Sequence, residues 1–229
     1  MKRYLLAHDL GTSGNKAVLF DTQTLSIVGD CTEVYQTYYP QDGFAEHNPE
    51  QWWQAVCTAT KKLLPGPGVS AADIAAVSFS AIMNTCLPVD KNGKPLCNAV
   101  IWADQRGAEQ LNKLYSAADE NTFYTTTGHR INGTYSITKM LWLQEHKPEI
   151  FDTAYKFLQV KDYVIRKMTG NFMSDYSDAS HVGCLNRNTK KYWSGLLEAL
   201  HIPEEKLPEL KKSTDIAGTL TSSAAEECG

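Results

Sequence analysis

The first thirty-five residues alternate short apolar runs with polar turns. The runs are RYLLAHDLG (3–11), KAVLFD (16–21) and LSIVGDCTEVY (25–35). Aliphatic and β-branched runs of this length, joined by short turns, are typical of consecutive antiparallel strands. The pattern therefore predicts a three-stranded meander at the start of the chain.

A helical pattern replaces the strand pattern at Pro49. Asn48 is a suitable N-cap, and Pro49 fits the first helical position, where its missing N–H would have no partner. Apolar side chains then recur at helical spacing, at Trp52, Val56, Ala59 and Leu63. We predict a helix that ends at the Pro-Gly-Pro-Gly run at 65–68, with Trp52 and Trp53 in the core.

Strand and helix patterns alternate along the rest of the chain. IAAVSFS (74–80) predicts a buried strand, and TCLPVDKNGKPLCNAVIW (85–102) predicts a hairpin whose KNG turn tolerates positive φ angles. Helical patterns follow at 105–116, 136–146 and 159–168. A last helix is expected near the end of the chain, with a serine cap at Ser222 or Ser223.

Composition and charge weigh against two classes of partner. The chain has 22 Lys and Arg against 26 Asp and Glu, a net charge of −4, and no basic segment of the kind that binds nucleic acid. Its most apolar internal stretch, 74–83, is far shorter than the ~20 residues of a membrane-spanning helix. We therefore expect neither nucleic-acid nor membrane binding.

Cysteine usage and the N-terminus suggest a compartment. The six cysteines include no CxxC pair, and the N-terminal apolar run is broken at His8 and Asp9, too early for a signal-peptide core. We expect a cytoplasmic protein with reduced thiols.

The stretch HDLGTSGNK (8–16) carries the first candidate chemistry. Asp9 ends the first predicted strand, and Lys16 begins the next. The turn between them contains Gly11, Thr12 and Ser13. Backbone N–H groups at a glycine turn suit phosphate oxygens, a carboxylate can hold Mg²⁺ through water, and a lysine adds positive charge. The set favours a kinase or ATPase that uses ATP and Mg²⁺.

An ordinary hairpin turn is the competing interpretation of this stretch, because Asp, Gly, Thr and Ser are common turn residues. Neither GxxxxGK[ST] nor GxGxxG, the common phosphate-binding patterns, is present.

The remaining motifs stand in a characteristic order. With the turn they are DLGTSGNKAVLFD (9–21), EHNPEQWW (46–53), SFSAIMNTCLPVD (78–90), IWADQRG (101–107), SITKMLWL (136–143), VKDYVIRKMTGNF (160–172) and SDYSDAS (174–180). In this number and order they resemble the N-terminal domain of the FGGY family of carbohydrate kinases, from Tyr4 to near the end of the chain. The resemblance implies an α/β actin-like ATPase fold of the RNase H type, with a mixed central sheet flanked by helices. It also implies phosphoryl transfer from ATP, with Mg²⁺, to a hydroxyl of a sugar or polyol.

The resemblance assigns roles to the opening turn. The family's phosphate turn falls on Gly11, Thr12 and Ser13, and its basic residue falls on Lys16. The acid that the family associates with its metal falls on Asp9. The resemblance therefore implies that Asp9 is the catalytic residue that organises the metal. All five residue types match.

The family's substrate loop falls on AIMNT (81–85). This loop is GQMHG in xylulokinases and NQRET in glycerol kinases. Met83 keeps the xylulokinase methionine, whereas Asn84 replaces the histidine, and the Arg-Glu pair of glycerol kinases is absent. The loop favours a xylulose-like ketose or polyol over glycerol, with sugar contacts from Met83 and Asn84.

The family's WxDxR motif falls on Trp102, Asp104 and Arg106. The resemblance implies that Trp102 presents its ring to the sugar and that Asp104 accepts hydrogen bonds from sugar hydroxyls. A core position is the alternative for Trp102. We expect Arg106 to form a structural ion pair.

The resemblance also bounds what residues 1–229 can do. The family places its catalytic aspartate and its C-terminal nucleotide-binding domain after the point where this chain ends. We therefore expect 1–229 to be the N-terminal, sugar-binding domain, inactive as a kinase by itself. Many members assemble as dimers, which makes a homodimer the assembly state to test. The alternatives are a stand-alone sugar-binding or regulatory module and a different, chaperone-like ATPase of the same fold.

Two further pairs of residues are expected to be structural. His129 and His181 have no partner at metal-ligand spacing, so loop positions are expected rather than roles as bases or ligands. Asp175 and Asp178 are expected to bond their own backbone in a turn.

Overall fold

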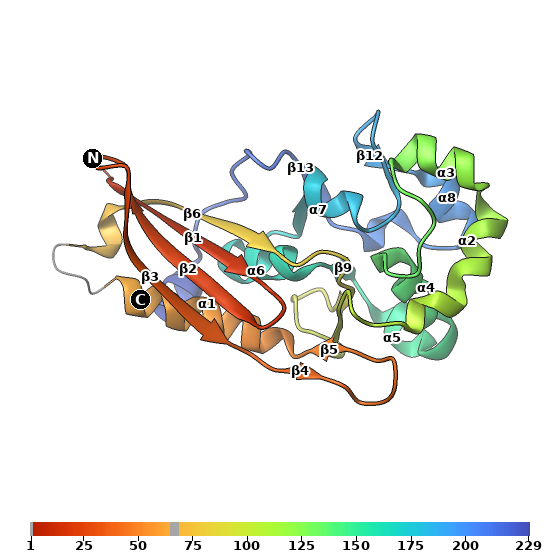
Figure 1. The fold of residues 1–229 in the computed structure, drawn as a ribbon, viewed down its shortest axis with the longest axis horizontal. Helices are drawn as coiled ribbons and strands as arrows, with labels where there is room; N and C mark the ends of the chain where they lie inside the picture. Colours follow the sequence, from red (N-terminus) through yellow and green to blue (C-terminus); the bar gives the residue numbers. More distant parts are fainter. Residues whose placement is uncertain (1, 65–68) are drawn as a thin grey trace.

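The protein is described by a computed structural model that covers residues 2–64 and 69–229. It is elongated (Figure 1). A four-stranded sheet lies at the end that also holds both termini, and a group of short helices forms the other end. The candidate phosphate turn lies at the tip of the sheet that points toward the helical end.

The principal sheet confirms the predicted meander. Its order is β3-β2-β1-β6, with bounds Ser26–Val34, Gly14–Asp21, Tyr4–Leu10 and Ile74–Ala81. β1 pairs antiparallel with β2 and parallel with β6, and β2 pairs antiparallel with β3. The mixed sheet with helices packed on it confirms the α/β fold class.

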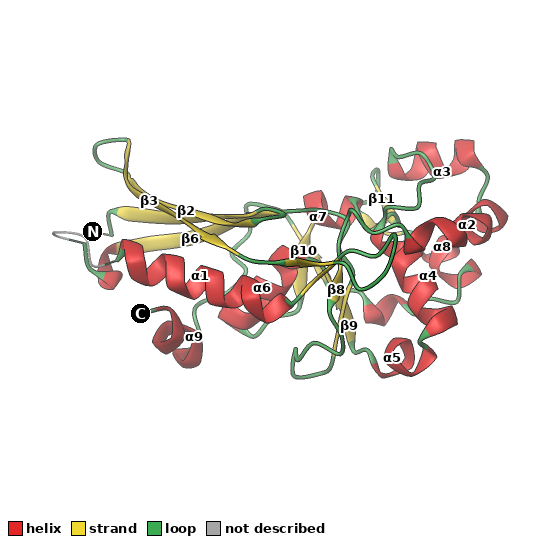
Figure 2. Ribbon diagram, turned by 60° about the horizontal axis from the view of Figure 1, so that its bottom comes forward, coloured by secondary structure: helices red, strands yellow, loops and turns green. Residues whose placement is uncertain are grey.

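One face of this sheet is covered by helices, and the other is open (Figure 2). The covering helices are α1 (Pro49–Leu63), α6 (Val160–Thr169) and α9 (Ser222–Cys228). α1 packs on β2 and β3, α6 packs on β6, and α9 packs on α1 and α6. Side chains of β1 alternate accordingly, since Leu6 and Leu10 are buried whereas Leu5 and Asp9 are exposed. The open face therefore displays Asp9 of β1 and Lys16 of β2.

The helix predicted at Pro49 begins there. Asn48 Oδ1 accepts a hydrogen bond from a first-turn N–H at 3.1 Å. Trp52 and Trp53 are buried, as predicted. Removing a buried tryptophan side chain costs about 3–5 kcal/mol, so these two residues contribute strongly to the packing of α1. The helix end predicted at 65–68 lies outside the described residues.

The prediction of a buried strand at 74–80 is wrong about burial. β6 forms there, but Ala75, Ala76, Ser78 and Ser80 are exposed. β6 is an edge strand of the sheet, and one of its faces belongs to the open side. The apolar composition of 74–80 fits both a fully buried strand and an edge strand with one open face, so it did not predict which of the two forms.

The segment predicted as a hairpin folds back on itself, but its strand pairs elsewhere. The Asp90 N–H donates to the Lys94 carbonyl at 2.9 Å, and Gly93 has a φ of 81°. β7 (Leu87–Val89) pairs along its length with β9 (Lys156–Leu158), whereas the two arms of the segment meet at isolated bridges. The sequence around β7 carries no sign of β9, because this partner strand lies almost seventy residues further along the chain.

Short helices and short ladders build the other end of the molecule. The helices are α2 (Leu111–Ala117), α3 (Glu120–Thr127), α4 (Ser136–His146), α5 (Pro148–Thr153), α7 (Tyr176–Ser180) and α8 (Ser194–Ala199). Two 3₁₀ turns also belong here, η2 (Arg106–Gln110) and η3 (Glu204–Lys206), whereas η1 (Ala71–Asp73) lies at the sheet end, directly before β6. The remaining strands are β4 (Thr37–Tyr38), β5 (Glu46–His47), β8 (Ala99–Val100), β10 (Met173–Asp175), β11 (Leu185–Asn186), β12 (Lys191–Tyr192) and β13 (Glu209–Lys211).

The predicted helices at 136–146 and 159–168 are confirmed to within one residue, and the one at 105–116 begins as η2 before it becomes α2. In the part of the chain that the structure describes, no helix combines the length and apolarity needed to cross a bilayer.

The cap predicted for the last helix is wrong by one residue. Thr221 caps α9, because its hydroxyl accepts a hydrogen bond from the Ala224 N–H at 3.2 Å. Ser222 is the first helical residue. Threonine caps a helix in the same way as serine, so the sequence offered three adjacent candidates.

A buried charge cluster forms where α6 meets β10 and α7. Lys161 Nζ lies 2.9 Å from an oxygen of Asp175 and 3.3 Å from one of Asp178. The Asp178 N–H donates to Asp175 at 2.9 Å, which confirms the predicted backbone bond for Asp175, whereas the carboxylate of Asp178 faces Lys161 instead. Asp162 is buried in the same cluster and accepts from the Gln159 N–H at 3.0 Å. Burial, together with the charge of Asp178, raises the pKa of Asp162 to about 7, and burial raises that of Asp178 to about 6.

Replacing Asp162 with Asn should reduce the loss of stability between pH 4 and pH 7. A carboxyl whose pKa rises on folding stabilises the folded state below its unfolded pKa, and that contribution is lost as the pH rises through the folded pKa. Between pH 4 and pH 7, we expect the free energy of unfolding of wild type to fall by about 2 kcal/mol more than that of Asp162→Asn. Urea denaturation at each pH measures this difference. Asp152→Asn, an exposed carboxylate on α5, is the control, and equal pH slopes for wild type and Asp162→Asn would contradict the assignment.

Candidate active site

The turn between β1 and β2 is held by contacts from β2 and from Tyr35. The Gly11 N–H donates to the Gly14 carbonyl at 2.9 Å. The Tyr35 hydroxyl donates to the Gly11 carbonyl at 2.5 Å, and the Tyr35 N–H donates to the Ser13 carbonyl at 3.2 Å. A Cβ at Gly14 would lie 2.6 Å from the Glu33 carbonyl oxygen, so only glycine fits there without movement. The turn is therefore held in place with the carbonyls of Gly11 and Ser13 engaged.

The donors of this turn are left available. Among the residues that the structure describes, the backbone N–H groups of Thr12 and Ser13 have no acceptor. Ser13 is exposed, and Thr12 is half-buried. Free N–H groups and hydroxyls on a tight turn are a suitable donor set for an anion such as phosphate.

Asp9 and Lys16 lie directly opposite each other on β1 and β2. Both are exposed, and both line a hollow of about 290 Å³ on the open face of the sheet. His8 also borders this hollow, but its ring is buried and receives a hydrogen bond from Asn15 at 3.0 Å. Burial lowers the pKa of His8 to about 4, so this histidine is neutral at pH 7. Lys16 is therefore the cation and Asp9 the carboxylate at this position.

Two other loops lie beside the turn. The Ile82 N–H donates to the carbonyl of Leu10, the residue before the turn, at 2.9 Å. This bond places the start of the predicted substrate loop at the end of β1. A bridge between Cys86 and Val100 then brings the end of that loop next to the segment that carries Trp102.

Trp102 joins the predicted substrate side to the predicted phosphate side. Its indole Nε1–H donates to Thr12 Oγ1 at 3.0 Å, and the residue is 46% exposed. The alternative of a core position for Trp102 is therefore wrong. Because the Thr12 hydroxyl accepts from the indole, its own proton remains free to donate to a ligand.

The predicted substrate loop presents an exposed thioether and a constrained amide. Met83 is 45% exposed. Asn84 has a φ of 59°, in the left-handed region, and its Nδ2 donates to Thr134 Oγ1 at 3.4 Å. In the described part of the chain, the buried Asn84 Oδ1 has no hydrogen-bond partner. A buried polar atom without a partner costs about 1–3 kcal/mol, and a ligand hydroxyl would satisfy it.

Lys139 is a residue of this site that the sequence analysis missed. It is fully buried on α4, and its ammonium donates to the backbone carbonyls of Asn84 and Thr134. Burial lowers the pKa of Lys139 to about 8. The lysine thus ties the substrate loop to the segment that precedes α4. Its place in the apolar motif SITKMLWL was a usable signal, because a lysine within a buried helix needs specific partners.

Tyr35 was also missed as a site residue. Tyr35 is the last residue of the third predicted strand. Its contact with Gly11 depends on the register between β2 and β3, which the sequence does not specify. Burial raises the pKa of Tyr35 above its usual range, with a smaller contribution from the charge of Asp9. Its hydroxyl therefore stays protonated and keeps donating to the turn.

Asp104 is placed differently from the expectation that it accepts from sugar hydroxyls. It is 1% exposed, and its oxygens accept from the Ala45 N–H at 2.6 Å and from Arg106 Nε at 2.8 Å. Arg106 also lies 2.7 Å from Glu46, which confirms its expected structural ion pair. Asp104 therefore positions the segment after Trp102 from within the fold and does not present an oxygen to a ligand.

His129 and His181 lie close together, although their sequence spacing gave no sign of it. Their ring centroids are 5.5 Å apart, and both residues are half-buried. Burial lowers the pKa of each ring, and the neighbouring ring lowers that of His181 further. Within the described residues, no group of three or more His, Cys, Asp or Glu could hold a metal ion.

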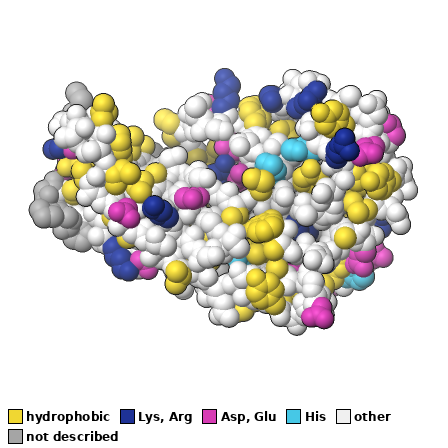
Figure 3. Space-filling view, in the orientation of Figure 1, with side chains coloured by type: hydrophobic (Ala, Val, Ile, Leu, Met, Phe, Trp, Pro, Cys, Tyr) yellow, Lys and Arg dark blue, Asp and Glu magenta, His cyan; other side chains and the backbone are white. Residues whose placement is uncertain are grey.

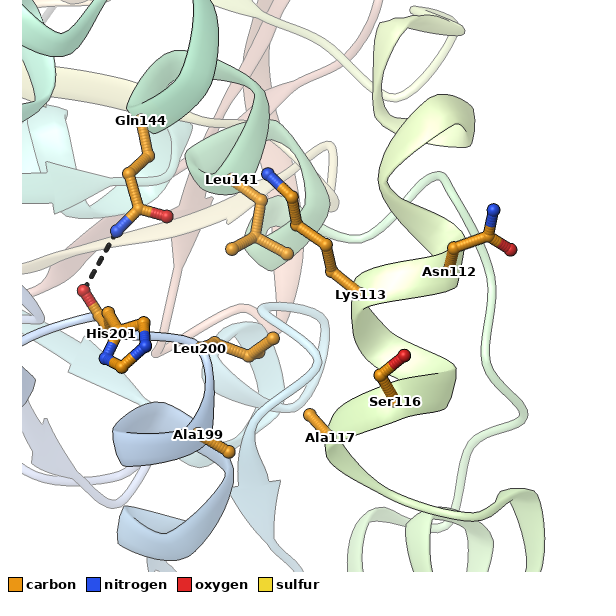
Figure 4. A pocket seen from close by; sticks show the side chains of 9 residues that line it. All are labelled: Asn112, Lys113, Ser116, Ala117, Leu141, Gln144, Ala199, Leu200 and His201. Carbon is orange, nitrogen blue, oxygen red and sulfur yellow. Dashed lines mark hydrogen bonds between the residues drawn. The ribbon is translucent and has the colours of Figure 1, made fainter.

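A second hollow, of about 480 Å³, lies at the helical end (Figure 4). Lys113 extends from α2 toward Leu141 of α4, and Gln144 Nε2 donates to the His201 carbonyl at 3.0 Å. No carboxylate lines this hollow, and it is remote from the turn between β1 and β2. We therefore place the candidate site at the sheet. On the face drawn in Figure 3, basic and acidic side chains are interspersed over the surface.

Comparison with known proteins gives a consistent set of relatives. A family model of the N-terminal domain of the FGGY family of carbohydrate kinases matches residues 4–229. Glycerol kinase from Trichodesmium erythraeum is 33% identical over 224 residues, which cover 95% of this chain and 44% of that protein. Xylulose kinase from Lactococcus lactis is 31% identical over 227 residues, which cover 97% of this chain and 44% of that protein. The crystal structure of gluconate kinase from Lactobacillus acidophilus has a TM-score of 0.90 at 27% identity and covers 99% and 45%.

The sheet and the helices packed on it therefore have the actin-like ATPase fold of the solved sugar kinases that the chain resembles. The chain belongs to the FGGY family of carbohydrate kinases, and the matched part is the family's N-terminal domain. It spans about 45% of the length of the relatives that it matches. Glycerol kinase and xylulose kinase match at nearly equal identity, so overall similarity does not select a substrate.

Replacing Tyr35 with Phe should loosen the turn without unfolding the sheet. The change removes the donor to the Gly11 carbonyl and keeps the ring, so we expect the free energy of unfolding to fall by about 1 kcal/mol. Amide hydrogen exchange at Gly11 and Tyr35 should accelerate, as measured by NMR. Tyr39→Phe, a change at a 71% exposed neighbour, should alter neither quantity. Unchanged exchange in Tyr35→Phe would show that the hydroxyl does not hold the turn.

Proposed function

We propose that the protein phosphorylates a hydroxyl of a sugar or polyol with ATP, and that this chain supplies the sugar-binding groups and the phosphate-facing turn. The hydrogen bond from Trp102 to Thr12 is the observation that carries this proposal. A kinase must hold its acceptor hydroxyl next to the transferred phosphoryl group. A direct contact between a sugar-facing ring and a phosphate-facing turn supports that arrangement.

On the phosphate side, each group has a separate task in the proposal. The N–H groups of Thr12 and Ser13 donate to phosphate oxygens, and Gly11 lets the backbone approach them. Lys16 adds a positive charge from the open face. Asp9 would hold Mg²⁺ through water, because it is an exposed carboxylate on the same face. The bound ion would supply neutralising charge to the phosphates.

On the sugar side, the proposal assigns three residues. Trp102 offers an exposed ring to the apolar face of a sugar, Met83 offers an exposed thioether, and the Asn84 amide bonds a hydroxyl through its unpartnered oxygen. A xylulose-like ketose or polyol remains our proposed substrate, because Met83 matches xylulokinases and the Arg-Glu pair of glycerol kinases is absent. Asp104, which is paired with Arg106 inside the fold, supports the segment that carries Trp102.

The reaction also needs a base for the attacking hydroxyl and a site for the nucleotide base. Asp9 is assigned to the metal, and Asp104 is engaged by Arg106. We therefore propose that both functions come from the part of the longer relatives that this chain does not cover. On this view residues 1–229 hold half of the complete site.

A stand-alone sugar-binding module is the second candidate. The observation in its favour is that all three residues assigned to the sugar lie in this one chain. Calorimetry of the chain with pentuloses, polyols and sugar acids tests binding, and a coupled ADP-release assay with the same panel tests phosphorylation by a protein that contains the chain and the remainder found in its relatives. Sugar binding without ADP release in that longer protein would favour the module. Nucleotide binding without sugar binding would favour a different ATPase of the same fold.

Replacing Asp9 with Asn should abolish most of the sugar-dependent ADP release while the fold remains intact. The amide keeps the size of the side chain and removes the charge that holds the metal, so we expect kcat to fall by about 100-fold or more. Circular dichroism monitors the fold. Asp30→Asn, an exposed carboxylate on β3 of the same sheet, is the matched control. Unchanged turnover in Asp9→Asn would mean that the turn has been misinterpreted.

Two substitutions at Asn84 separate its backbone role from its contact with sugar. Gly accepts the φ of 59°, so Asn84→Gly removes only the amide, whereas Asn84→Ala also strains the backbone. We expect both to weaken sugar binding about 10-fold with no change in the KM for ATP, because one hydrogen bond is lost. Asn84→Ala should in addition lower the free energy of unfolding by about 1 kcal/mol. Equal sugar affinity in wild type and Asn84→Gly would exclude the contact.

A further inference from the structure

Two cysteines from opposite ends of the chain meet beneath the sheet. Cys57 lies in the middle of α1, and Cys228 is the last residue of α9, 171 positions away. Their sulfur atoms are 3.3 Å apart, and both residues are buried. We propose that Cys57 and Cys228 form a reversible disulfide under peroxide stress, which fastens α9 to α1.

Neighbouring contacts hold the two helices together beside the cysteines. The Trp53 indole, one helical turn before Cys57 on α1, donates to the carboxylate of Glu227, the residue before Cys228 on α9. The sulfur atoms must approach by about 1.2 Å to reach the disulfide bond length of about 2.05 Å.

The immediate surroundings favour one thiolate at a time. The hydrogen bond between the two thiols lowers the pKa of Cys228 and raises that of Cys57. The positive charge of Lys61, on the same helix as Cys57, favours the thiolate form of both sulfurs, whereas burial and the charge of Glu227 oppose it. We assign the first reaction to Cys228, because opening of α9 exposes it, and Cys57 is then the resolving thiol.

Hydrogen peroxide is the oxidant that the site can use, because it is small. The Cys228 thiolate attacks one peroxide oxygen, the O–O bond breaks, and the departing hydroxide takes up a proton to become water. The Cys57 sulfur then displaces hydroxide from the Cys228 sulfenic acid, and this hydroxide leaves as a second water when it takes the remaining thiol proton. The S–S bond contains both sulfurs in oxidised form, and one peroxide has been reduced to two waters.

Access to Cys228 comes from local opening of α9, which packs on α1 and α6. Such opening exposes Cys228 while Cys57 stays within α1. Cys86 and Cys184 differ, because both are fully buried and burial raises their pKa well above the usual thiol range. The oxidation is therefore expected to select this pair over Cys86 and Cys184.

Peptide mapping tests the pairing. The protein is treated with hydrogen peroxide, free thiols are alkylated, and the chain is cleaved after both basic and acidic residues, which separates Cys31 from Cys57. We expect the main cross-linked species to join the Cys57 peptide to the Cys228 peptide. The apparent Tm should rise by about 5 °C and return after dithiothreitol, because the bond closes a long loop.

Cys57→Ala and Cys228→Ala should each abolish the cross-link and the Tm rise, whereas Cys31→Ala and Cys97→Ala should retain both. Thermal unfolding of the untreated variants shows that each is folded before oxidation. Cross-links that mainly involve other cysteines would overturn the proposal. So would separate oxidation of Cys57 and Cys228 to sulfinic acids without a bond between them, or a Tm rise that persists in Cys228→Ala.

Discussion

The antiparallel pairing of β1 with β2 is the constraint on which the candidate site depends. Its register sets Asp9 opposite Lys16 and leaves three residues to turn the chain. Because side chains alternate along a strand, the same register places both charged groups on the open face and directs Leu6 and Leu10 toward the helices. A slip of one residue would bury the charges and expose the core. The apolar layer beneath the sheet and the polar site above it are thus specified together.

Burial divides the charged residues around this sheet into two groups. Asp9 and Lys16 are exposed, so they can exchange water for a ligand. Lys139, Asp104 and Arg106 are buried and fully engaged by carbonyls or by each other. Removing one partner of a buried pair leaves the other charge without compensation, which is strongly destabilising. These buried groups therefore hold the substrate-side loops in position, and the exposed pair is left for chemistry.

The sequence predicted the elements whose stability is decided by near neighbours. The meander, the cap at Asn48 and the helix at 136–146 follow from spacing and turn residues, and all three are present. The sequence failed where the deciding partner is remote. The exposure of Trp102 depends on Thr12, ninety positions away, and the burial of Asp104 depends on Ala45. Motif matching located these residues, but only the packed fold separates a residue that faces a ligand from one that supports it.

Under the proposed function, position 84 offers a way for one fold to serve different sugars. Its φ of 59° lies in a region that Asn, Asp and His tolerate better than most non-glycine residues. The histidine of the xylulokinase loop belongs to the same tolerant set as Asn84. In the proposed function, the residue that selects the sugar is therefore drawn from the few side chains that fit this backbone. Lys139 donates to the backbone carbonyl of residue 84, and every amino acid has this carbonyl. The loop can therefore keep its shape while the side chain at position 84 varies between an amide and an imidazole.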